Sequence, residues 1–134
     1  ALRREIAARG LAPRFRFFGE TSRIHALLAA ADIVALPSVD LYAKMDYPLV
    51  LLEAMSLGRA VVVARGSAAE ELAADDAARA VEASPDALAS EFTRLLADDA
   101  DRLQLGARAR ERVMMRYGHM SMAAAYEALY DELL

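Results

Sequence analysis

Two short, uninterrupted apolar runs constrain the fold of this chain more than any other feature. Ile33–Leu36 reads IVAL and stops at Pro37, and Ala60–Ala64 reads AVVVA. Neither run alternates apolar with polar residues, as a strand with one solvated face would. Such runs are typical of strands in a parallel sheet that helices cover on both faces.

Segments with helical patterns separate and follow these runs, so strands and helices alternate along the chain. This alternation predicts an α/β domain, a doubly wound, Rossmann-like parallel sheet with a helical C-terminal tail. A chain of 134 residues has the size of one domain, and we expect residues 1–134 to form a single domain. Two further strands are predicted, at Phe15–Phe18 and Arg79–Ala83. The first four predicted helices are one that ends at Gly10, one that begins after Thr21 or Ser22, one that follows Pro48 and one that passes through AAEELA. Three more helices are predicted in the C-terminal part: Pro85–Ala97, Asp99–Arg116 and a last helix that ends at Leu134.

The composition narrows the classes of protein that this chain can belong to. With 57% hydrophobic and 27% charged residues, it has the composition of a soluble globular chain. A net charge of −4 argues against a nucleic-acid partner, because no basic excess is available to neutralise phosphates. The absence of cysteine excludes disulfides and thiolate metal sites and fits a reducing, cytoplasmic location. The sequence opens in mid-helix pattern without a methionine or a signal peptide, so we expect a fragment of a longer protein.

Glu53 is a single acid in the apolar segment LVLLEAMSL. Because proline is favoured in the first turn of a helix, we predict that Pro48 opens a helix here and that Gly58 ends it. In open parallel sheets, ligands bind at the carboxyl ends of strands, where helix N-termini expose free amides. The amides of residues 49–51 can then face an anion, and Glu53, one turn deeper, can accept hydrogen bonds from a ribose diol. The pattern predicts a nucleotide site. The alternative is that Glu53 and Ser56 form a narrow polar strip on the helix that is exposed to solvent and binds nothing.

Four other residues near the predicted strand ends are candidates for the same site, each with a structural alternative. Ser38 follows the IVAL strand and can contact a nucleotide or stabilise a turn. Gly19 closes FRFFG and either allows a base or a backbone segment to approach closely or simply forms a turn. Lys44, in the loop before the predicted helix, can face a diphosphate, and Asp46 in the same loop is a candidate by its place near the presumed donor site. The alternative for both is that they lie in solvent.

The blocks FRFFG, DIVALPS and DYPLVLLEAMSLGRAVVVA, in this order and spacing, resemble a known family. The resemblance is to the C-terminal, nucleotide-sugar-binding domain of retaining GT-B glycosyltransferases of the glycosyl transferases group 1 family. RYGHMSMAAAYEALYDELL resembles the closing aromatic helix of the family, so the resemblance covers essentially the whole chain. It implies the C-terminal half of a GT-B fold and an N-terminal, acceptor-binding domain that is absent here.

The resemblance also implies roles for individual residues. Glu53 matches the second glutamate of the family pattern, which is assigned to the ribose hydroxyls of the donor. Met45 stands where the family has its first glutamate, which contacts hydroxyls of the transferred sugar, and a thioether is at best a weak acceptor. Asp46 or Lys44, next to Met45, can serve instead from a rearranged loop. The amides that map to the segment cradling the sugar and diphosphate are those of Tyr47, Leu49 and Val50.

Two departures from the family pattern concern the region after AVVVA. Ser67 replaces the second glycine of a Gly-Gly turn, and Glu70 keeps the glutamate that follows it, for which we expect a structural role near a helix end. The segment ADDAARAVEA lacks the glycine that the family has in its next turn, so we expect a different loop there.

The function that the resemblance implies is transfer of a hexosyl group, with retention, from a nucleotide diphosphate sugar to a glycan, lipid or small acceptor. The catalytic residues are unknown, and the fragment alone is expected to transfer nothing. No metal or other cofactor is expected, because no metal-ligand set is present. The expected partners are the nucleotide-sugar donor and the missing N-terminal domain, and peripheral association of the full-length protein with the inner face of a membrane stays open. The alternative is a non-catalytic, glycosyltransferase-like nucleotide-binding domain, which Met45 supports best.

Overall fold

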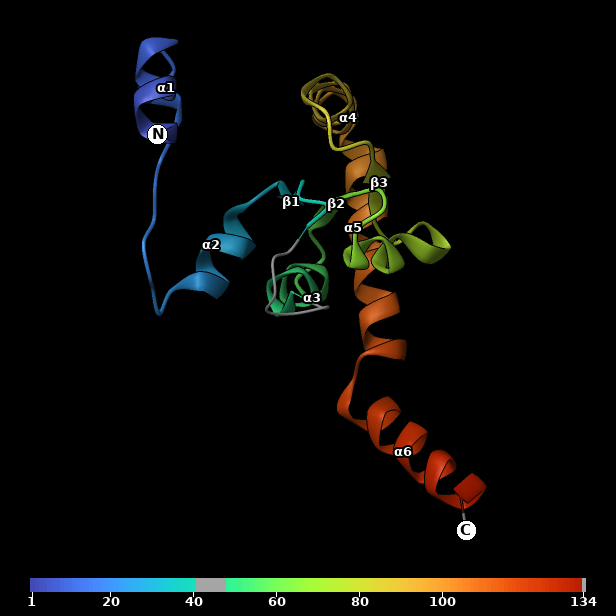
Figure 1. The fold of residues 1–134 in the computed structure, drawn as a ribbon. Helices are drawn as coiled ribbons and strands as arrows, with labels where there is room; N and C mark the ends of the chain where they lie inside the picture. Colours follow the sequence, from blue (N-terminus) through green and yellow to red (C-terminus); the bar gives the residue numbers. More distant parts are fainter. Residues whose placement is uncertain (41–47, 134) are drawn as a thin grey trace.

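A parallel sheet of three strands lies at the centre of the computed structural model, which describes residues 1–40 and 48–133 (Figure 1). The strands are β1 (Ile33–Leu36), β2 (Ala60–Ala64) and β3 (Arg79–Val81), in the spatial order β1-β2-β3. Leu36 lies opposite Val63, and Ala64 lies opposite Val81. The parallel sheet that the apolar runs predict is therefore confirmed.

The helices surround this sheet and continue beyond it. Those described are α1 (Leu2–Ala8), η1 (Ala12–Arg14), α2 (Ile24–Ala30), α3 (Leu49–Ser56), η2 (Ala68–Asp76), α4 (Pro85–Ala97), α5 (Asp99–Arg116) and α6 (His119–Leu133), η1 and η2 being 3-10 helices. The predicted bounds of α4 and α5 are confirmed, because each begins at a side-chain cap. Ser84 accepts a hydrogen bond from the Ala87 amide at 3.2 Å, and Asp98 accepts one from the Asp101 amide at 2.9 Å.

Both faces of β2 are buried, as in a doubly wound sheet. On one face, Val61 and Val63 pack in a cluster with Leu51 and Met55 of α3 and with residues of α2, η2 and α5. On the other face, Ala60 and Val62 pack with Leu95 of α4 and Leu105 of α5. Burial of each such aliphatic side chain contributes about 1.5–3 kcal/mol. This explains why β2 contains only apolar residues.

Two glycines allow α5 to cross the chain between α3 and β2. Gly58 ends α3, as predicted, with a φ of +68° that other residues adopt at a cost. A Cβ atom at Gly106 of α5 would lie 2.1 Å from the Gly58 carbonyl oxygen. The helix therefore touches the backbone directly at this point.

The predicted strand at Phe15–Phe18 is wrong for the described structure. Phe15 is extended, with φ −112° and ψ 136°, but its segment pairs with no described strand. The residues before α2 run apart from the sheet in Figure 1, and a strand needs a hydrogen-bonding neighbour. Phe15 and Phe17 instead stack on one another with ring centroids 6.3 Å apart, and the Arg3 guanidinium lies 4.3 Å from the Phe17 centroid.

Several element ends also differ from the predictions. Pro48 occupies the N-cap position of α3 rather than its first turn, and β3 ends at Val81. Thr21 accepts a hydrogen bond from the Arg23 amide at 3.1 Å, but Arg23 is the N-cap of α2 and no side chain caps this helix. The predicted helix through AAEELA is the 3-10 helix η2.

The last residues of η2 have an unusual backbone conformation in the segment that lacks a glycine. Asp75 and Asp76 are consecutive residues with φ values of +57° and +54°. Aspartate tolerates this left-handed region better than most residues other than glycine. The two aspartates therefore take the place of the glycine.

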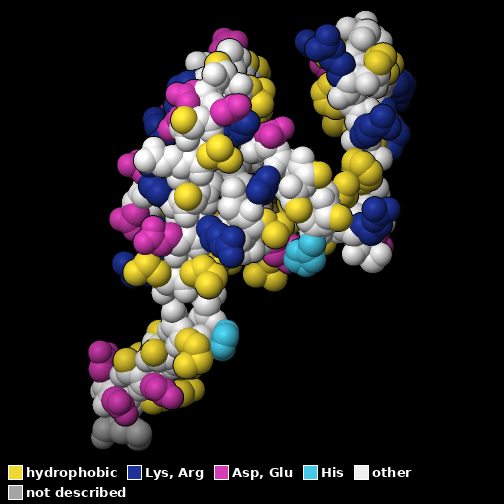
Figure 2. Space-filling view, turned by 180° about the vertical axis from the view of Figure 1, so that it is seen from behind, with side chains coloured by type: hydrophobic (Ala, Val, Ile, Leu, Met, Phe, Trp, Pro, Cys, Tyr) yellow, Lys and Arg dark blue, Asp and Glu magenta, His cyan; other side chains and the backbone are white. Residues whose placement is uncertain are grey.

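The tail helix α6 does not join the core. None of its residues is buried, and it extends away from the sheet in Figure 1. Hydrophobic side chains follow its length in Figure 2, and Tyr126 and Tyr130 lie one turn apart with ring centroids 6.5 Å apart. None of the described helices is long and apolar enough to cross a membrane.

Candidate functional site

The N-terminus of α3 lies at the carboxyl edge of the sheet. The chain leaves the carboxyl end of β1 at Leu36 and enters α3 at Leu49, and α3 then leads through Gly58 into the amino end of β2. The helix therefore runs antiparallel to the strands. Its first amides lie where open parallel sheets bind their ligands.

The two faces of α3 are chemically different. Leu51, Ala54 and Met55, spaced by three and four residues, are buried against the sheet and α5. Leu49 lies on the outer face with 59% of its surface exposed, and Glu53 follows one turn later on the same face, half-buried. The sequence pattern predicted this shared face correctly.

The first turn of α3 is open to an acceptor. The initial amides of any helix lack an intrahelical partner, and no side chain of the described residues caps this one. The Leu51 amide already donates to the Pro48 carbonyl at 2.9 Å, so of the three predicted amides it is the one least available. Leu49 and Val50 are the described amides placed to meet an anion, helped by the positive end of the helix dipole.

The Glu53 carboxylate has no partner among the described residues. The Ser56 hydroxyl donates to the backbone carbonyl of Glu53 at 2.7 Å and not to its carboxylate. A half-buried carboxylate that accepts no hydrogen bond from the described residues needs donors from elsewhere, because burying it without them is costly. The side chain is therefore suited to accept two hydroxyl groups from outside.

Ser38 shows the structural role that was considered for it, and Gly19 shows neither a turn nor a close approach of a described segment. The Ser38 hydroxyl, just beyond the carboxyl end of β1, donates to the Asp40 carbonyl at 2.7 Å and so stabilises a turn. Gly19 has an ordinary φ, and a Cβ atom placed on it would meet nothing within 4 Å. No described backbone segment approaches Gly19 closely. Neither observation tests contact with a ligand.

The other predicted contacts fall outside the described residues. These are Lys44, Met45, Asp46 and Tyr47.

Two charged residues at the carboxyl edge were missed by the sequence reasoning. Arg65 directly follows β2, and its Nη1 donates to Oε1 of Glu82, which directly follows β3, at 3.1 Å. Both side chains are more than half exposed, at 57% and 67%. Arg65 directly follows the predicted strand Ala60–Ala64, and this position was the signal that pointed to the carboxyl edge, whereas Glu82 lay inside the predicted strand Arg79–Ala83. A guanidinium there is suited to a diphosphate, and Glu82 shields it in the present arrangement.

Glu70 has the structural role that the sequence predicted. Its Oε2 accepts a hydrogen bond from the Gly66 amide at 2.7 Å. Gly66 has a φ of +77°, so the carboxylate holds a glycine turn at the exit of β2. This acid is at the carboxyl edge but has its partner within the chain.

A network of four charges occupies the opposite, amino edge of the sheet. Arg79 at the start of β3 donates to Asp101 at 3.2 Å and lies 3.6 Å from Glu91. Arg94 donates to both acids at 2.6 Å. The hydrogen bond from Arg94 holds the pKa of the Asp101 carboxyl below its usual range, and the hydrogen bonds to Glu91 and Asp101 raise the pKa of Arg94. Every charge in this network has an opposite charge beside it. Because the four residues come from β3, α4 and α5, the network joins these three elements.

The part of the chain that the structure describes contains no group of side chains suited to hold a metal ion. Within 1–40 and 48–133, no three histidine, aspartate or glutamate side chains gather closely enough to hold a metal ion.

Comparisons with known proteins agree with this fold. Residues 1–98 match the family Glycosyl transferases group 1. Sucrose-phosphate synthase from Thermosynechococcus elongatus is similar in structure, with a TM-score of 0.83, 26% identity, and coverage of 98% of this chain and 33% of that chain. The HepE protein of Anabaena, solved in complex with UDP, has a TM-score of 0.81 and 26% identity, and the match covers 97% of this chain and 36% of that chain.

These matches confirm the predicted C-terminal half of a GT-B fold. The chain spans about a third of the length of the two solved structures. A search of curated proteins found no significant match.

Proposed function

This chain belongs to the glycosyl transferases group 1 family, and from that premise we propose that it is the donor-binding domain of a glycosyltransferase. The full-length protein transfers a hexosyl group, with retention, from a nucleotide diphosphate sugar to a glycan, lipid or small acceptor. Residues 1–134 form one domain of it, and an N-terminal domain binds the acceptor. The coverage of about a third of two related structures supports this division.

One observation carries the proposal. Glu53, a half-buried carboxylate without a described partner, lies one turn behind an uncapped helix N-terminus at the carboxyl edge of a parallel sheet. In the proposed complex, the amides of Leu49 and Val50 donate to the diphosphate. Glu53 accepts one hydrogen bond from each ribose hydroxyl.

The chemistry follows from this placement. As the glycosidic bond to the diphosphate breaks, negative charge grows on the leaving oxygens. Amides and cationic side chains already directed at that position stabilise the charge without reorganising. Arg65, at the same edge, becomes available for this role when Glu82 releases it. The reaction takes place between this domain and the acceptor-binding domain, so this domain alone binds donor and transfers nothing.

The first experiment is a calorimetric titration of the protein with UDP, GDP, ADP and their sugars. UDP is the first to test because a related structure, HepE of Anabaena, was solved with it. We expect saturable binding of one nucleotide, weakened at least roughly tenfold, or about 1.4 kcal/mol, in Glu53→Ala. Glu127→Ala, which removes an exposed acid from α6, is the matched control and is expected to bind like the wild type. No response to any of these ligands at millimolar concentration contradicts the proposal.

A second candidate function is a non-catalytic domain that keeps the nucleotide site. Met45, in place of a family glutamate, is the observation that favours it. Transfer activity of the full-length protein, lost on substitution of Met45 or Asp46, supports the enzyme. Nucleotide binding without transfer to any acceptor supports the second candidate.

A further inference from the structure

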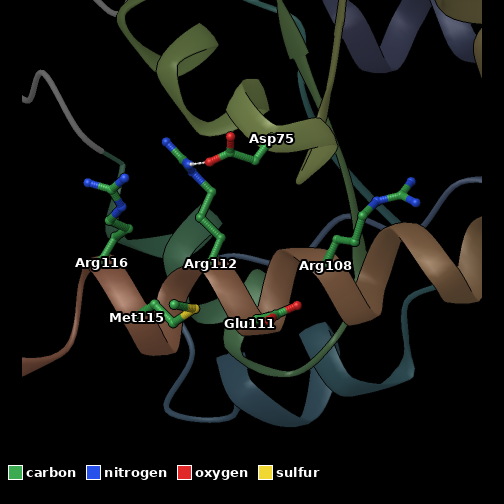
Figure 3. Close-up of a pocket in the computed structure, with 6 residues that line it drawn as sticks. All are labelled: Asp75, Arg108, Glu111, Arg112, Met115 and Arg116. Atoms are coloured by element: carbon green, nitrogen blue, oxygen red, sulfur yellow. Dashed lines mark hydrogen bonds and ion pairs between the residues drawn. The ribbon is translucent and has the colours of Figure 1, made fainter.

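A groove with a volume of about 300 Å³ follows the C-terminal half of α5 (Figure 3). It is lined by Asp75, Arg108, Glu111, Arg112, Met115 and Arg116. None of these six residues lies in α3, and none is among the predicted nucleotide contacts. The proposal made here therefore uses other residues than those of the proposed nucleotide site.

Three guanidinium groups line this groove from one face of one helix. Arg108, Arg112 and Arg116 are spaced by four residues, and Figure 3 shows Arg112 and Arg116 extending to the same side of α5. Like charges at this spacing destabilise a helix by about 0.2–0.5 kcal/mol per pair. A row of three cations is also unexpected in a chain whose net charge is −4.

The protein neutralises these charges only in part. Nη1 of Arg112 donates to Asp75 at 2.5 Å, and Nη2 donates to the Glu71 carbonyl at 3.2 Å. Arg108 donates to a neutral group, the Asp76 carbonyl, at 3.0 Å. Arg116 is exposed and forms no hydrogen bond or ion pair with any described residue. No described residue therefore competes with a ligand for its donors.

The loop beside these arginines is strained. Asp75 and Asp76 both have left-handed backbone conformations, each of which costs roughly 1 kcal/mol for a residue with a side chain. Arg108 and Arg112 hold this loop through the contacts given above. Backbone strain of this kind is concentrated at ligand-binding and switch regions. The left-handed residues and the row of cations meet at the same groove.

We propose that this groove binds a phosphate group, held by the guanidinium groups of Arg112 and Arg116 with Arg108 beside them. Guanidinium groups match the oxygens of phosphate in pairs, and Arg112 is already oriented by Asp75 and the Glu71 carbonyl. The bound anion relieves the repulsion along α5. The phosphate belongs either to a soluble small molecule or to a lipid headgroup, and the two sources share this chemistry.

Titration of the full-length protein with inorganic phosphate at low ionic strength tests the site. We expect saturable binding that is weakened roughly tenfold in Arg116→Gln. Arg110→Gln removes an equal charge from α5 at an exposed position outside the groove, and we expect it to bind phosphate like the wild type. Thermal unfolding of both variants separates lost binding from lost folding, because Arg116 also lies in the last turn of α5, where a cation favours the helix.

Two results overturn the proposal. One is the absence of saturable binding to the wild type up to about 20 mM phosphate. The other is an equal loss in Arg116→Gln and Arg110→Gln, which indicates attraction to net charge without a site. Co-sedimentation with vesicles of phosphatidylcholine containing about a third phosphatidylglycerol identifies the source of the phosphate. Vesicle binding that Arg116→Gln abolishes assigns a lipid headgroup, and phosphate binding without vesicle binding assigns a soluble ligand.

Discussion

The two edges of the sheet differ in whether their half-buried acids have partners among the described residues. At the amino edge, Arg79 and Arg94 contact Glu91 and Asp101, and each charge has a partner within the chain. At the carboxyl edge, the Glu53 carboxylate has no partner among the described residues, although it is half-buried.

Charges that are paired within the chain hold elements together. A partly desolvated charge that no described residue neutralises is instead a candidate for binding a ligand. The predictions below test this difference, and they begin with the largest expected change in stability.

Removal of Arg79 should have the largest effect on the fold. Arg79→Ala leaves Glu91 and Asp101, whose side chains are 14% and 21% exposed, with Arg94 as their remaining partner. We expect a loss of about 2 kcal/mol, less than for a fully buried pair, because the network is partly exposed. Urea denaturation measures this loss as a lower midpoint with an unchanged slope.

Arg65→Ala is the matched control at the carboxyl edge. It breaks an ion pair of the same type whose side chains are 57% and 67% exposed, and we expect a change of less than about 0.5 kcal/mol. Equal losses in the free energy of unfolding in Arg79→Ala and Arg65→Ala would show that burial does not decide how much an ion pair contributes to stability here.

Substitution of Glu70 tests whether an acid contributes to nucleotide binding merely because it lies at the carboxyl edge. Glu70→Ala removes the acceptor of the Gly66 amide and should cost about 1 kcal/mol in stability, with no change in nucleotide affinity. Glu71→Ala, the exposed neighbour, should leave stability almost unchanged. A loss of nucleotide binding in Glu70→Ala at unchanged stability would contradict the structural role of this acid.

The network at the amino edge should also give the protein a specific response to acid. The folded-state pKa of Asp101 is held below its usual value, chiefly by the hydrogen bond from Arg94. A depressed carboxyl pKa contributes stability that is present above the unfolded-state value, near 3.9, and is lost as the pH falls through the folded-state value. Urea midpoints measured from about pH 6 down to about pH 2 should therefore fall less steeply in Asp101→Asn than in the wild type. Asp131→Asn, in the exposed α6, should follow the wild-type curve.

The parts of the fold that the sequence predicted well are those with local signals. IVAL and AVVVA are strands because neither has a polar face, and α4 and α5 begin where Ser84 and Asp98 can cap them. The FRFF segment has the composition of a strand, but pairing depends on a neighbouring edge that lies far away in sequence. Asp75 and Asp76 adopt a glycine-like conformation only because Arg108 and Arg112 of α5 hold them there.

The candidate site was predictable in part for the same reason. The helical period places Leu49 and Glu53 on one face, and the structure confirms this. Two facts about Glu53 depend on how α3 packs and cannot be derived from spacing: its half-burial and its lack of a described partner. Arg65 and Glu82 come together only because β2 and β3 are neighbours in register.

The central claim is that Glu53 accepts hydrogen bonds from the ribose of a nucleotide, and one cycle of four titrations tests it most directly. The nucleoside diphosphate that binds is compared with its 2′,3′-dideoxy analogue, on the wild type and on Glu53→Ala. The account predicts that the wild type prefers the hydroxylated ligand by roughly tenfold, or about 1.4 kcal/mol, and that Glu53→Ala shows no preference. An equal preference in both proteins would contradict it, because the hydroxyl groups would then be recognised without Glu53.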